Sequence, residues 1–220
     1  MIENMSNSSD MKKLIEEIIK IEWAFFDKVK NEGGRAECQD DFRTFSIMRR
    51  SQYMAWSPAM LASWMDDLRE ALDDEEGRNP LTEKYGYMMC ISEPDKNTEL
   101  AKRLPDISEE KRAIAHRITE KLLPQNEAFR AKYPNVAGRG RPLRTSEEAA
   151  SGFTSIETYE LGELFTYSMR TLKLFEEHLT GLEKEGVSYP ETVIENSLRQ
   201  RGFTGLAHAE EYLDISSRTE

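Results

Sequence analysis

The residues best suited to chemistry gather between Glu22 and Gln52, where one predicted helix ends and the next begins. This stretch is rich in arginines, carboxylates and amides, far beyond what a turn between two helices needs. Guanidinium groups bind carboxylates and phosphates through two parallel hydrogen bonds. The side chains that we expect to contact a ligand here are Asn31, Arg35, Gln39, Asp41 and Gln52. The stretch therefore predicts a binding site for a small anionic molecule.

Glu22 is the candidate general acid or base of this site. At about 100° per residue, it falls near the centre of the apolar arc of a helix predicted over residues 10–31. A buried carboxylate costs several kcal/mol unless it is paired, hydrogen-bonded or protonated. Glu22 therefore needs a polar partner, either in a structural salt bridge or in a ligand pocket where burial tunes its pKa.

Arg49 offers a matching partner from the next predicted helix, residues 39–55. Asp41, Arg49 and Gln52 all fall on the apolar face of that helix. A forked donor in this position can bind the carboxylate of Glu22 or that of a ligand. The alternative is that Arg49 lays its stem along neighbouring aromatic rings and extends its charged head into solvent.

A third group of candidates lies in a helix predicted over residues 154–185. Tyr159, Glu163 and Tyr167 are four residues apart, so they share one side of that helix. They form either a wall of a cleft or a stripe that faces solvent or a second subunit. Glu157 lies in the first turn, close to the core direction, where it either caps the helix or faces the ligand.

Arginines also concentrate in the least regular stretch of the chain, residues 135–153. Arg139, Arg141 and Arg144 alternate there with glycine and proline. Glycine lets backbone amides approach an anion, and arginine matches its oxygens. The loop is either a device that steers anions towards the site or a local balance to an acidic surface.

Hydrophobic periodicity predicts an all-α fold, a single bundle of seven or eight helices. The expected helices cover residues 10–31, 39–55, 58–77, 80–91, 108–133, 154–185, 189–201 and 206–213. The alternating β-branched runs that are typical of strands do not occur. We expect a disordered leader at residues 1–9, one helical domain at 10–215 and a polar tail at 216–220.

Composition narrows the classes of partner. The 220 residues carry a net charge of −11, which argues against general binding to nucleic acid or to an anionic membrane, since both need clustered cations. No run approaches the ~20 apolar residues that span a bilayer. Cys38 and Cys90 have no CxxC spacing, and we expect them to be reduced thiols in the cytoplasm. Cys38 lacks a credible histidine partner for nucleophilic catalysis.

The motifs predict neither a metal nor a cofactor. None of the three histidines has a glutamate three residues before it, as carboxylate-bridged metal bundles require. The chain has no GxGxxG pattern for a dinucleotide and no GxxxxGK[ST] loop for a phosphate.

Three motifs resemble a bacterial family known as a domain of unknown function. They read EWxxFxxVxNEGGRAxCQDDxxTFxIMRxSQ from Glu22, LTEKYxxMM from Leu81 and TSxETYxxGELxTYS from Thr154, and together they span nearly the whole chain. The resemblance implies membership but no reaction. Against the family pattern, Arg43 stands where an acidic residue is more usual, and Glu160-Leu161 stands where Leu-Arg is common.

The function expected from these residues is acid–base catalysis on a small anionic metabolite, carboxylate- or amino-acid-like, without a cofactor. A lyase or an isomerase suits such residues best. The predicted catalytic residues are Glu22, Arg49 and Tyr159, and the predicted substrate-binding residues are Asn31, Arg35, Gln39, Asp41, Gln52, Arg141, Glu157 and Glu163. The alternative is a non-catalytic module that binds a ligand or a partner, or forms a homodimer through Trp23, Trp56 or Trp64, with Glu22 and Arg49 as a structural pair.

Overall fold

The computed structural model describes residues 8–31, 33–138 and 140–217, and this part of the chain is helical without a β-strand. The all-α prediction is thus confirmed. The helices are α1 (Ser8–Phe26), α2 (Phe42–Tyr53), α3 (Pro58–Asp73), α4 (Pro80–Ser92), α5 (Thr98–Ala101), α6 (Glu109–Lys132), α7 (Pro134–Ala137), α8 (Glu148–Ser151), α9 (Ile156–Leu164), α10 (Met169–Glu185), α11 (Tyr189–Gln200) and α12 (Leu206–Ser217). Two 3-10 turns, Glu37–Asp40 and Thr145–Glu147, precede α2 and α8. The predicted leader and tail fall largely on residues 1–7 and 218–220, which lie outside the described residues.

The described residues form twelve α-helices, so the predicted number of seven or eight is wrong. Three of the additional helices, α5, α7 and α8, are single turns of four residues. The fourth arises because the helix predicted over residues 154–185 is broken between Leu164 and Met169. Ser168 ends the break by capping α10, where its side chain accepts a hydrogen bond from the backbone N–H of Thr171.

The corner between α1 and α2 is held by amides rather than by regular helix. α1 ends at Phe26, five residues before the predicted end. Gln39 is buried and donates its amide to the carbonyl oxygens of Phe26 and Val29, both at 2.9 Å. Its Oε1 accepts from the side chain of Asn31. The bond to Phe26 satisfies the last carbonyl group of α1, and the bond to Val29 fixes the turn that follows it.

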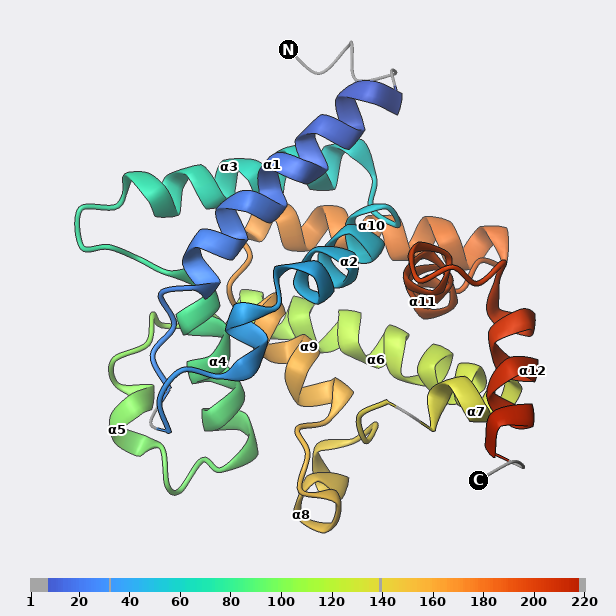
Figure 1. Cartoon of the computed structure of the whole chain (residues 1–220). Helices are drawn as coiled ribbons and strands as arrows, with labels where there is room; N and C mark the ends of the chain where they lie inside the picture. The colour runs from blue at the N-terminus through green and yellow to red at the C-terminus, as the bar shows by residue number, and fades with distance from the viewer. Residues whose placement is uncertain (1–7, 32, 139, 218–220) are drawn as a thin grey trace.

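The long helices enclose one core (Figure 1). α1 crosses α2 and α3, α4 packs against α9, and α6 lies between α9 and α10 and contacts α11. The largest fully buried side chains include Trp64 of α3, Tyr53 of α2 and Tyr167 of the break between α9 and α10. α12 packs on α7 at the edge of the molecule. No helix within the described ranges has the length and apolar character needed to cross a membrane.

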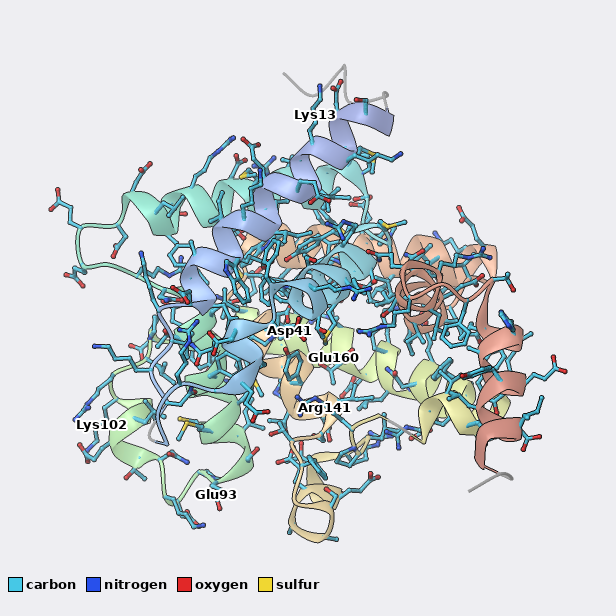
Figure 2. The ribbon with its side chains drawn as sticks, in the orientation of Figure 1. Lys13, Asp41, Glu93, Lys102, Arg141 and Glu160 are labelled. Carbon is cyan, nitrogen blue, oxygen red and sulfur yellow. The ribbon has the colours of Figure 1, made fainter. Side chains whose placement is uncertain are left out.

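Charged side chains cover the outside of this bundle (Figure 2). Lys13, Glu93 and Lys102 lie at the rim, whereas Glu160 lies in the middle of the view. Several charged side chains are nevertheless buried, among them Glu22, Arg49, Lys84 and Glu163. Ionised groups are rarely buried unless they are paired. The charged residues of the interior therefore mark the place to look for a site.

Candidate functional site

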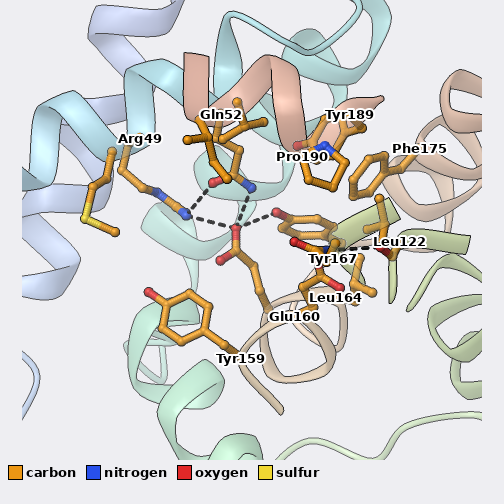
Figure 3. A pocket seen from close by; sticks show the side chains of 15 residues that line it. Arg49, Gln52, Leu122, Tyr159, Glu160, Leu164, Tyr167, Phe175, Tyr189 and Pro190 are labelled. Atoms are coloured by element: carbon orange, nitrogen blue, oxygen red, sulfur yellow. Dashed lines mark hydrogen bonds and ion pairs between the residues drawn. The ribbon is translucent and has the colours of Figure 1, made fainter. Parts of the chain in front are cut away.

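A cavity of about 240 Å³ lies where α2, α6, α9, α10 and α11 meet (Figure 3). Its apolar wall comes from Leu122, Leu164, Phe175, Pro190, Val193 and Ile194. Its polar wall comes mainly from α2 and α9, with Arg49, Gln52, Tyr159, Glu160 and Glu163. A small number of polar groups against an apolar surface is the usual composition of a small-molecule site.

Arg49 and Glu22 form a buried ion pair behind this polar wall. Arg49 donates from Nε to Glu22 Oε2 at 2.8 Å and from Nη2 to Glu22 Oε1. Tyr53 and Trp64 also donate to Glu22 Oε1, so the carboxylate on α1 is held from two helices, α2 and α3. The expectation that Glu22 points inward and needs a polar partner is met. Glu22 is fully buried and is not one of the described residues that line the cavity.

Glu163 is the hub on the cavity side. Its Oε1 accepts hydrogen bonds from Arg49 Nη1 at 2.9 Å, Gln52 Nε2 at 3.0 Å and the hydroxyl of Tyr167 at 2.7 Å. Its Oε2 is paired with Lys84 of α4. Burial acts to raise the pKa of Glu163, but the charges of Arg49 and Lys84 outweigh it and hold that pKa well below its ordinary value.

Glu22, Arg49, Lys84 and Glu163 form what we call the charge cluster. Its two cations and two carboxylates balance, and each cation contacts at least one carboxylate. Arg49 uses Nε, Nη1 and Nη2 within the protein, and it is 7% exposed rather than extended into solvent. Arg49 therefore has little donor capacity left for a ligand.

Tyr159 lines the cavity beside this cluster. Lys84 Nζ lies 3.7 Å from the centroid of its ring, and the guanidinium carbon of Arg141 lies 5.0 Å from the same centroid. The charge of Lys84 lowers the pKa of the Tyr159 hydroxyl, and burial opposes that shift only in part. Tyr159 is thus a more acidic phenol than an ordinary tyrosine.

Glu160 is the one described residue with a buried side-chain oxygen or nitrogen that has no hydrogen-bond partner. That atom is Oε2, which is sealed from solvent although other parts of the residue retain some exposure. Burial, followed by the negative charges of Glu163 and Glu157, raises the pKa of Glu160 to about 8. A carboxyl left unsatisfied in a cavity is costly, and such groups concentrate at functional sites.

Residues 12–211 match the model of a family described as a protein of unknown function, DUF4125. The chain belongs to the DUF4125 family. The predicted membership in a family of unknown function is confirmed by this match, which covers nearly the whole chain. No curated protein and no solved structure gave a match to it.

In this DUF4125 member, four of the predicted binding residues are absent from the cavity lining: Asn31, Arg35, Gln39 and Asp41. The expectation that Asp41 faces inward is wrong: it is exposed and caps α2 by accepting a hydrogen bond from the backbone of Thr44 at 2.9 Å. Arg35 is also exposed and pairs with Asp27 and Asp40. Asn31 and Gln39 hold the corner after α1, as described above.

The arginine-rich loop reaches the site only through Arg141. Arg141 is exposed, donates to the carbonyl oxygen of Thr154 at 3.2 Å and covers the ring of Tyr159. Arg144 is paired with Glu127, and Arg139 lies outside the described residues. Glu157 accepts from the backbone N–H of Thr145 at 2.9 Å, so it fastens the loop to α9.

Sequence reasoning missed two residues of this DUF4125 site, Lys84 and Glu160. The only available signal for Lys84 was a charged pair, Glu83-Lys84, in a short and otherwise apolar helix. Within the part of the chain that is described, no three histidine, cysteine, aspartate or glutamate side chains are grouped as metal ligands would be. The polar groups that line the cavity are carboxyl, phenol, amide and guanidinium groups.

Proposed function

We propose that this protein is a bacterial, cytoplasmic enzyme that acts by acid–base chemistry on a small molecule bound in the cavity. The observation that carries the proposal is that Glu160, a residue of the cavity lining, has a buried Oε2 without a partner. An unpaired buried oxygen costs free energy, and a ligand whose donor reaches the carboxyl group of Glu160 would supply the missing partner.

Glu160 and Tyr159 are the proton-transferring pair of this proposal. The pKa of Glu160 is raised to about 8, whereas that of Tyr159 is lowered. Two neighbouring groups whose pKa values are shifted in opposite directions can act as acid and base at neutral pH. In the empty cavity Glu160 holds its proton at neutral pH, while Tyr159 is the readiest of the three phenols that line the cavity to give up its proton.

The charge cluster has a positioning role in this proposal. Arg49, Lys84 and Glu163 join α2, α4 and α9, and α9 carries both Tyr159 and Glu160. Glu22 contacts Arg49, Tyr53 and Trp64 behind the wall, so we assign it to holding Arg49 rather than to the reaction. Rigid support of this kind keeps reacting groups within the narrow geometry that catalysis needs.

The reaction class that suits this pair is an isomerisation or an elimination. Both move protons between a substrate carbon or leaving group and the protein, and neither needs an electron donor or acceptor. A lyase or isomerase therefore remains the preferred assignment, with the acid–base role moved from Glu22 to Glu160.

Solvent deuterium tests the proposal directly. A panel of small metabolites is screened by thermal shift, because saturating ligand at 100 times its Kd stabilises the fold by roughly 2.7 kcal/mol. Each ligand found is then followed by NMR in D₂O for deuterium uptake at carbon or for product. We expect uptake with the wild type, loss of uptake with Glu160→Gln, and wild-type uptake with Glu177→Gln on the exposed side of α10.

A second candidate is a ligand-binding module without turnover. It is favoured by the charge cluster, whose cations and carboxylates are paired with one another. Such pairing is explained by a structural role alone. Ligands that stabilise the protein through the cavity, yet exchange no deuterium and give no product, would support this candidate and exclude the enzyme.

A further inference from the structure

The charge of the ligand can be inferred from which charged groups of the cavity lining already have partners within the protein. Arg49 is the cation among the described lining residues, and its guanidinium is already shared by Glu22, Gln52 and Glu163. An anionic ligand that took Arg49 would leave one or both buried carboxylates without their main partner. Breaking a buried pair in this way is strongly unfavourable.

The polar atom without a partner belongs to a carboxyl group of the cavity lining, that of Glu160, which can bind a cation. Oε2 of Glu160 has no partner, and the neighbouring groups that act on this carboxyl are the negative side chains of Glu163 and Glu157. An anion bound beside Glu160 would add to the negative charge of Glu163 and Glu157 that already acts on this carboxyl group. A cation placed here would instead favour the ionised form of Glu160 and satisfy the atom that burial leaves alone.

The rest of the lining suits the body of a weakly polar cation. Four aromatic side chains, those of Tyr159, Tyr167, Phe175 and Tyr189, line the cavity together with aliphatic residues of α6 and α11. Aromatic faces attract ammonium groups, and more strongly where water is excluded. Lys84 and Arg141 already lie over the ring of Tyr159, so the other three rings are the ones available.

We infer that the ligand of this cavity is a small organic amine, with its ammonium group against Glu160 and an apolar body against α6 and α11. This assignment rests on the proposed function, because it names the substrate class of the same site. The bound ammonium group ionises Glu160, which then acts as the base of the pair. It replaces the anion expected from the arginines of the sequence. An apolar cavity of about 150 Å³ admits benzene, so a cavity of about 240 Å³ accommodates a ring with a short amine-bearing chain.

Three probes with the same body and different charge test the inference: 2-phenylethylamine, 2-phenylethanol and phenylacetate. Affinities are measured by calorimetry on the full-length protein, and methyl NMR shifts of Leu122 and Val193 report whether each probe enters the cavity. We expect the amine to bind about tenfold or more tightly than the alcohol and the carboxylate, because charge-assisted hydrogen bonds are roughly twice as strong as neutral ones.

Two variants separate this effect from a general loss of the fold. Glu160→Gln keeps the shape of the side chain but not its charge, and it should weaken the amine about tenfold while changing the alcohol by less than about threefold. Glu177→Gln removes one exposed carboxylate and should leave all three affinities unchanged. Thermal melting of each variant checks that it is folded.

The outcomes also distinguish the inference from the proposed function. Phenylacetate binding as tightly as the amine, an unchanged amine affinity in Glu160→Gln, or no binding of any probe would each overturn the amine assignment. The proposed function is judged separately, by deuterium uptake across the metabolite panel. A neutral or anionic substrate that takes up deuterium would leave the function standing and the amine class wrong.

Discussion

Arg49 holds two buried carboxylates at once, whereas its neighbour Arg50 holds Glu16 at a half-exposed position on the same helix. Arg49→Met leaves Glu22 and Glu163 without their main partner, and we expect it to lower the free energy of unfolding by about 3–5 kcal/mol. Arg50→Met removes a screened pair and should cost less than about 1 kcal/mol. Urea denaturation followed by tryptophan fluorescence measures both. Equal losses of unfolding free energy in Arg49→Met and Arg50→Met would mean that burial does not increase the contribution of an ion pair to stability.

Glu160 should make the protein less stable as the pH rises. The pKa of its carboxyl is about 8 in the folded protein and near 4.5 in the unfolded chain, so the folded state holds a proton that the unfolded state releases. Its contribution to stability is complete below about pH 4.5 and is lost as the pH rises to about 8, a change of up to a few kcal/mol.

Comparison with Glu160→Gln isolates this contribution from other titrating groups. The difference in urea midpoint between wild type and Glu160→Gln is expected to grow from pH 5 to pH 8, with the variant more stable at the higher pH. Glu177→Gln serves as the control, because its exposed carboxylate should leave the wild-type pH profile unchanged. A constant difference across this range would show that Glu160 titrates normally.

The inward aim of Glu22 and Arg49 was predictable from the sequence, because each falls within the apolar arc of its own helix. Their position relative to the cavity was not, since a helical wheel gives a direction but no depth. Lys84 was hidden because α4 is buried on nearly all sides and has no polar face to contrast with it. Glu160 was hidden because the 154–185 segment, read as one helix, misses the change of direction at residues 165–168.

At the level of the helices, the contact between α4 and α9 depends on Gly162. A Cβ atom at this position would lie 2.5 Å from Met88 Cγ and 3.0 Å from the carbonyl oxygen of Lys84. Gly162→Ala should therefore push α9 away from α4 and cost roughly 1–3 kcal/mol, despite the better helix propensity of alanine. It should also separate Glu163 of α9 from Lys84 of α4, which form an ion pair between these two helices.

Gly181 of α10 provides the matched control, because a Cβ atom there meets nothing within 4 Å. Gly181→Ala should stabilise the protein by about 0.5–1 kcal/mol through helix propensity alone. Thermal melting of the two variants gives the comparison. A stabilised Gly162→Ala would show that α4 and α9 can separate without loss, and that their close approach is not required.

The molecule as a whole should unfold in one step. A single core cluster contains residues from α1, α2, α3, α4, α6, α9, α10 and α11, so no long helix of that group has a core of its own. Trp56 and Trp64 are buried in this cluster and Trp23 packs against it. We expect tryptophan fluorescence and far-ultraviolet circular dichroism to give coincident urea transitions. Two separate transitions would contradict a single helical domain.

The fold class followed from helical periodicity and the near absence of strand patterns, and the ends of most helices followed from their caps. Ser57-Pro58 and Asn79-Pro80 mark the starts of α3 and α4 where expected. The breaks that sequence did not reveal, as at Ser168, are set by tertiary contacts. There the backbone N–H of Ser168 bonds to Asp67, which lies on α3, about a hundred residues earlier in the chain.

The charge cluster also has a consequence for biosynthesis. Lys84 and Arg49 find Glu163 at separations of 79 and 114 residues along the chain. At 5–20 residues per second, the ribosome adds Glu163 roughly 4–16 s after Lys84. During that interval the nascent chain carries a lysine whose burial has no compensating carboxylate. The N-terminal helices are therefore expected to stay loosely packed on the ribosome, so that the domain closes only after α9 has been released from the exit tunnel.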